Sequence, residues 1–164
     1  MSIGYFAAYD FARGIAAAAG GNAAEARVSL AQLQARIDAA RVDAAHATAD
    51  SHGMAMADWH DRTTADELEQ ARAMAAALRG TIEYYGGHRA AGLARVREAI
   101  AMTAHMDFEY GPPWSVKPLD ELLGELLLTD GRREEAAAAF QKTLTAYPNR
   151  RLALEGLAAS GTMR

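Results

Sequence analysis

The sequence predicts an all-α fold, and three observations carry that prediction. Alanine, the strongest helix former, is abundant, while aromatic residues make up only 7% of the chain. Apolar residues recur at intervals of three and four, which is the period of an amphipathic helix. Glycine pairs and prolines separate these periodic stretches, as helix ends require. We expect about seven helices, arranged as three antiparallel pairs and one terminal helix.

The first predicted pair covers about 5–47 and turns at Gly20, Gly21 and Asn22. Asn22 suits the N-cap of the second helix, because its side chain can accept a hydrogen bond from the first helical turn. The second helix carries an apolar stripe made of Ala26, Leu30, Leu33 and Ile37.

The second predicted pair covers about 65–105 and turns at Gly86 and Gly87. An irregular connector, 46–64, precedes it. A second connector, 106–116, follows it and contains Gly111-Pro112-Pro113, which is incompatible with helix.

The third predicted pair covers 117–148 and turns at 129–131. Its first helix carries a leucine stripe, and Pro148 ends its second helix. The stretch 151–160 predicts a single terminal helix of the kind that covers the last core face of a repeat array.

Small residues recur at the same offsets in the pairs, which indicates an internal repeat. In each set the second residue lies seven positions after the first, and the third lies twelve positions after the first. The sets are Gly14, Gly21 and Ala26; Gly80, Gly87 and Gly92; and Gly124, Gly131 and Ala136.

The third pair resembles a tetratricopeptide repeat (TPR), a helix–turn–helix unit of about 34 residues with the pattern W-x2-L-G-x2-Y, A-x3-F and P. Asp120 and Leu127 replace the Trp and Tyr of the pattern, so one aromatic-filled pocket is absent or refilled. The matching residues are Leu123, Gly124, Ala136, Phe140 and Pro148. The resemblance implies a TPR-like α-solenoid over 1–164 with a C-terminal capping helix.

Glycine inside a helix costs about 1 kcal/mol relative to alanine, so these positions need a reason. We expect Gly14, Gly80 and Gly124 to let facing helices lie nearly backbone to backbone, with Ala136 opposite Gly124. Phe140 would fill the space between this pair and its neighbour.

The TPR resemblance also implies a concave groove formed by the first helix of each pair. The groove candidates are Met74, Thr81, Tyr84, Tyr85, Glu121, Glu125 and Leu128. This surface lacks the Lys/Asn/Arg set with which some TPR proteins hold a peptide carboxylate, so a basic or apolar segment is the expected ligand. The alternative is that Met74, Tyr84 and Tyr85 pack on the connectors.

Composition restricts the classes of function. The net charge of −4 argues against a general nucleic-acid binder, and the absence of cysteine excludes disulfides and thiol chemistry. No run of apolar residues is long enough to cross a membrane, and 1–4 do not begin a secretory signal, so a cytoplasmic protein is expected.

Candidate chemistry is weak. His46, His52 and His60 have spacings that fit no helical metal-ligand pattern, and Gly86, Gly87 and Gly92 lack the strand and Lys-Ser/Thr of a phosphate loop. We therefore expect no catalytic residue, metal or cofactor.

The TPR resemblance implies a non-enzymatic scaffold that binds a protein or peptide. Two alternatives stay open: a small-molecule or metal-binding module that uses the 46–60 connector, and a structural end segment, with the chain as the C-terminal part of a longer TPR protein. Partner identity and oligomeric state do not follow from the sequence.

Overall fold

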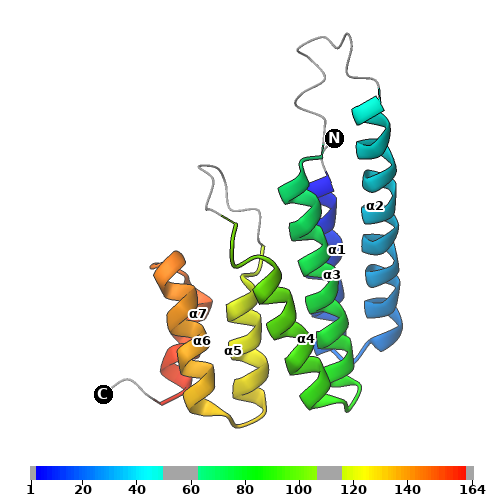
Figure 1. Cartoon of the computed structure of the whole chain (residues 1–164). Coiled ribbons are helices and arrows are strands. Elements are labelled where there is room, and N and C mark those ends of the chain that lie inside the picture. The colour runs from blue at the N-terminus through cyan, green and yellow to red at the C-terminus, as the bar shows by residue number, and fades with distance from the viewer. Residues whose placement is uncertain (1–2, 50–62, 107–115, 162–164) are drawn as a thin grey trace. The chain divides into compact units, whose positions relative to one another are not determined.

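A computed structural model describes residues 3–49, 63–106 and 116–161, and within these residues the chain forms seven helices and no strand. The all-α prediction is therefore confirmed. The helices are α1 (Ile3–Ala19), α2 (Ala23–Ala49), α3 (Ala65–Tyr85), α4 (Arg89–Met102), α5 (Leu119–Thr129), α6 (Arg133–Ala146) and α7 (Arg151–Ala159) (Figure 1).

The helices group into two compact units, Met1–Val116 and Lys117–Arg164. In the first unit, α1 packs against both α2 and α3, α2 also contacts α3, and α3 pairs with α4. In the second unit, α5 pairs with α6, and α7 contacts both. Figure 1 shows α1 to α4 as long, side-by-side helices, with α2 extending past the end of its partner α1.

The turns inside the three predicted pairs have the same geometry. Gly21, Gly87 and Gly131 each adopt a positive φ, between 75° and 96°, which glycine tolerates and other residues rarely adopt. The amide after each glycine donates to the carbonyl five residues earlier, at 2.8–2.9 Å, and the glycine amide donates to the carbonyl three residues earlier. This pair of hydrogen bonds is the Schellman ending of a helix, and it sends the chain back along the helix that it has just left.

The helix starts follow from side-chain chemistry at two positions. The Asn22 carboxamide oxygen accepts from the Glu25 amide at 3.2 Å, as its predicted N-cap role requires. Thr64 and Glu67 form a reciprocal capping box at the start of α3, with distances of 3.1 and 2.8 Å.

Gly80 allows the close backbone approach that we expect at the glycine positions. A Cβ on Gly80 would lie 2.7 Å from the Gly92 carbonyl oxygen, and a Cβ on Gly92 would overlap the Gly80 carbonyl and the Tyr84 amide. The two glycines therefore let α3 and α4 cross with backbone against backbone.

At Gly14 and Gly124, side chains occupy the space instead. The Leu78 methyl groups lie 2.5 and 2.7 Å from a Cβ built on Gly14, and Cε1 of Phe140 lies 2.8 Å from one built on Gly124. The expectation that Ala136 faces Gly124 across a bare backbone contact is wrong, because the Phe140 ring fills that space. Gly156 on α7 borders the same ring, so Phe140 is held between α5 and α7.

Candidate functional site

The predicted groove residues divide into buried and accessible side chains. Met74, Thr81, Tyr84 and Glu121 are buried, with at most 4% of their surface exposed. They therefore do not present a binding surface, and that part of the groove prediction is wrong. Tyr85 is 44% exposed, and Glu125 and Leu128 are partly exposed.

The buried residues of α3 serve packing. The Thr81 hydroxyl donates to the Ala77 carbonyl within its own helix at 2.9 Å. Tyr84 lies where α3 meets Gly92 of α4, and its ring packs edge-on against Tyr85 with 5.2 Å between centroids. The guanidinium of Arg89 lies 5.5 Å from the Tyr84 ring centroid. Tyr84, a predicted groove residue, thus belongs to the packing between α3 and α4.

The acidic residues of α5 are neutralised inside their own unit. Arg150 donates to the buried Glu121 carboxylate from Nε at 2.5 Å and from Nη2 at 2.9 Å. Nζ of Lys117 lies 3.4 Å from Glu121 and 2.6 Å from Glu125. The hydrogen bonds with Glu121 are the main reason that the pKa of Arg150 is raised. These two acids therefore carry little net charge toward a ligand.

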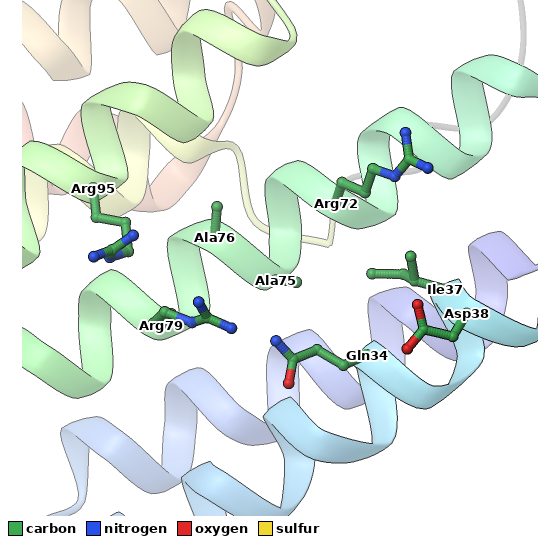
Figure 2. Close-up of a pocket in the computed structure, with 8 residues that line it drawn as sticks. All are labelled: Gln34, Ile37, Asp38, Arg72, Ala75, Ala76, Arg79 and Arg95. Atoms are coloured by element: carbon green, nitrogen blue, oxygen red, sulfur yellow. The ribbon is translucent and has the colours of Figure 1, made fainter. Parts of the chain in front are cut away.

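A cleft of about 460 Å³ opens in the first unit along α2, α3 and α4. From α2 the side chains of Gln34, Ile37 and Asp38 face α3, and Arg95 reaches in from α4 (Figure 2). The α3 side of the cleft consists of Arg72, Ala75, Ala76 and Arg79.

Some of the charged side chains that line this cleft have ion-pair partners, and others do not. Arg95 donates from Nε to both Glu83 oxygens, at 3.1 and 3.0 Å. Asp38 faces Arg41 at 3.7 Å. Neither Arg72 nor Arg79 forms a hydrogen bond or ion pair within the part of the chain that the structure describes. Among the described residues, the cleft therefore keeps two guanidinium groups with no carboxylate at ion-pair distance, although the Asp38 carboxylate lines the same cleft.

The lining arginines suit the binding of an anionic group. Arginine stays protonated at all ordinary pH values and presents a planar set of N–H donors that matches carboxylate or phosphate oxygens. Gln34 adds an amide donor and acceptor, and Ile37, Ala75 and Ala76 add apolar surface. These side chains can hold an anionic group beside an aliphatic one.

The histidines that could have formed a metal site belong to the predicted connector, 46–64. His52 and His60 lie outside the described residues, as does the side chain of His46. Among the described residues, no group of three or more His, Asp or Glu side chains could hold a metal ion.

Sequence reasoning missed the cleft, although part of it was readable. Arg72 and Arg79 lie seven residues apart in a predicted helix, which is about two turns, so they share a face with Ala75 and Ala76 between them. The contributions of Gln34, Asp38 and Arg95 depend on how α2 and α4 pack on α3, which no local pattern predicts.

None of the described helices is both long and apolar enough to traverse a bilayer. No family model, curated protein or solved structure matches the chain.

Proposed function

We propose that the chain is a non-enzymatic, TPR-like helical-repeat module that binds a segment of another protein. The observation that carries this proposal is the cleft of the first unit, where Arg72 and Arg79 have no hydrogen-bond or ion-pair partner among the described residues and lie beside apolar side chains. A binding surface needs such a combination, because unpaired donors provide specificity and aliphatic surface provides affinity.

The repeated turn geometry supports the TPR-like part of the proposal. Three helix pairs end their first helix with the same Schellman hydrogen bonds at Gly21, Gly87 and Gly131. Each turn glycine follows a buried helix glycine by seven residues. A chain that repeats one hairpin design suits stacking of pairs into a solenoid, and solenoids present extended surfaces to other proteins.

The kinds of side chain in the cleft support a role in binding. Its polar lining consists of arginines, one amide and one carboxylate. Arginine stays protonated near neutral pH and cannot act as a base, and the carboxylate of Asp38 faces Arg41. These groups position a ligand and have no evident role in transforming it.

The proposal is tested with an array of random 12-residue peptides probed with the full chain. Peptides that bind are then added to the chain in solution, and hydrogen exchange is followed by mass spectrometry. We expect protection of backbone amides in 31–42 and 68–80, the segments of α2 and α3 that border the cleft. Binding by no peptide, or protection confined to other segments, would contradict the proposal.

A further inference from the structure

We infer that the cleft recognises an extended acidic segment in which two carboxylates are separated by two residues. This inference rests on the proposed function and names the chemistry of the partner. It also reverses the expectation of a basic or apolar ligand, which relied on a different surface that contains Glu121 and Glu125 and lacks a Lys/Asn/Arg set. Those acids pair with Lys117 and Arg150. In the cleft, Asp38 has Arg41 as its partner, and Arg72 and Arg79 are the charged groups with no partner among the described residues.

The spacing of the two arginines sets the spacing of the carboxylates. Arg72 and Arg79 lie on one face of α3, about 10.5 Å apart along the helix axis at 1.5 Å per residue. A polyproline II segment has three residues per turn and rises about 3.1 Å per residue, so side chains three positions apart share a face about 9.3 Å apart. The long arginine side chains can move enough to close the difference of about 1 Å between these two spacings. Two acids at positions i and i+3 of such a segment therefore fit the pair.

The rest of the cleft suits a peptide that lies between those two contacts. Ala75 and Ala76 occupy α3 between the arginines, and Ile37 faces Ala75 from α2 (Figure 2). This floor is apolar and shallow, so small aliphatic residues or proline fit between the acids. The Gln34 amide, which has no hydrogen-bond partner within the described chain, can bond to the peptide backbone.

A peptide is favoured over a nucleic acid by the same side chains. No aromatic ring lines the cleft on which a base could stack. The chain carries a net charge of −4, and a duplex or single strand would bring many phosphates against that negative surface. A short acidic segment places charge only where the two guanidinium groups lie.

The test measures fluorescence anisotropy of labelled 12-residue peptides with the full chain at about 50 mM salt, where exposed ion pairs are weakly screened. Four peptides share one proline- and alanine-rich background: two Glu at i and i+3, two Glu at i and i+1, two Glu at i and i+6, and two Gln at i and i+3. We expect the first peptide to bind about tenfold more tightly than the Gln peptide, since two exposed ion pairs contribute only modestly to affinity. The other two Glu peptides should fall between them.

Two double variants test whether the i, i+3 peptide binds in the cleft. Arg72→Gln/Arg79→Gln should reduce the affinity for the i, i+3 peptide to that of the Gln peptide. The control Arg133→Gln/Arg151→Gln removes the same charge from exposed positions of the second unit and should leave the affinity unchanged. Thermal melting of both variants should match the parent, which shows that any loss is not unfolding.

Several outcomes would overturn the inference. Equal affinity for all three Glu spacings would show charge attraction without the proposed register. An equal loss in both double variants would place the binding elsewhere, and tighter binding of polyphosphate or single-stranded DNA would assign the cleft to another ligand. If the peptide array yields basic or apolar binders that protect α2 and α3, the inference fails while the proposed function stands. If no peptide binds at all, both fail.

Discussion

Arg150 and Glu121 form a two-point ion pair across 29 residues of sequence, with Nε and Nη2 of the arginine 2.5 and 2.9 Å from the carboxylate oxygens. Glu121 has no exposed side-chain surface, whereas the Arg150 side chain is 26% exposed. Arg150 immediately precedes α7, so the pair ties the start of that helix to α5. A buried carboxylate is tolerated only with such partners.

Removing Arg150 should therefore destabilise the second unit strongly. Arg150→Met leaves the Glu121 carboxylate buried with only Lys117 nearby, and we expect a loss of about 3 kcal/mol. Hydrogen exchange by mass spectrometry, read on peptides from α5 and α7, measures the loss locally. Arg151→Met, which removes an exposed ion pair with Glu155, should change the opening free energy by less than about 0.5 kcal/mol.

The double variant Glu121→Leu/Arg150→Met shows whether the instability of Arg150→Met comes from the lost ion pair or from the buried Glu121 carboxylate that is left without Arg150. It removes both buried groups and adds apolar volume, so most of the stability should return. If the double variant is as unstable as Arg150→Met, the buried charge is not the cause.

Tyr147 should make the second unit sensitive to alkaline pH. Burial raises the pKa of its phenol above the ordinary value of about 10, against a smaller opposing effect of the Arg150 charge. The folded state therefore holds the proton more tightly than the unfolded state. This contribution to stability is complete below pH 10 and is lost as the pH rises through the folded pKa.

Urea unfolding between pH 8 and pH 11.5, compared in the parent and Tyr147→Phe, measures this effect. The parent should lose stability more steeply above pH 10 than the variant, because phenylalanine has no proton to release. Identical slopes would show that Tyr147 does not contribute.

The helix glycines should differ in their tolerance of alanine. At Gly80 the new Cβ meets the Gly92 carbonyl oxygen, which moves only if α3 and α4 separate, so we expect a net loss of about 2 kcal/mol. At Gly14 the Cβ meets Leu78 methyl groups, which can rotate, and alanine's helix propensity offsets part of the strain. Gly14→Ala should therefore cost less than about 1 kcal/mol. Urea unfolding of the two variants checks this order, and equal losses would contradict it.

The helices and turns were predictable because local chemistry determines them. Gly21, Gly87 and Gly131 needed a left-handed backbone that few other residues accept, and Asn22 had a side chain suited to cap α2. These features depend on residues within five positions of each other, which a sequence pattern captures well.

The site was harder to predict, because it depends on distant residues. Glu121 was predicted to line the groove, but its carboxylate is buried and pairs with Arg150, which lies 29 residues further along the chain. Tyr84 seemed open to a ligand, but the approach of Gly92 places α4 against it. Only the i, i+7 relation of Arg72 and Arg79 was visible in the sequence.

Asp10 and Arg36 connect α1 and α2 in an ion pair whose members differ in exposure. Nε of Arg36 lies 2.6 Å from Oδ2 of Asp10, and the Asp10 side chain is 2% exposed while that of Arg36 is 40% exposed. The guanidinium also lies over the Phe6 ring, 4.6 Å from its centroid. If Arg36 loses its partner, its partly exposed guanidinium can still be solvated. The buried Asp10 carboxylate cannot be solvated in the same way.

The two alanine variants should therefore be unequal. Arg36→Ala leaves a buried carboxylate and removes the contact with Phe6, and we expect a loss of about 2–3 kcal/mol. Asp10→Ala leaves an arginine that reaches solvent, so its loss should be about 1 kcal/mol. Arg13→Ala is the matched control, because it breaks another α1–α2 ion pair, with Glu25 at 3.0 Å, in which both side chains are about 40% exposed. Urea unfolding should rank the losses Arg36→Ala, Asp10→Ala, Arg13→Ala. A larger loss in Asp10→Ala than in Arg36→Ala would show that the stranded Asp10 carboxylate is not the main cost.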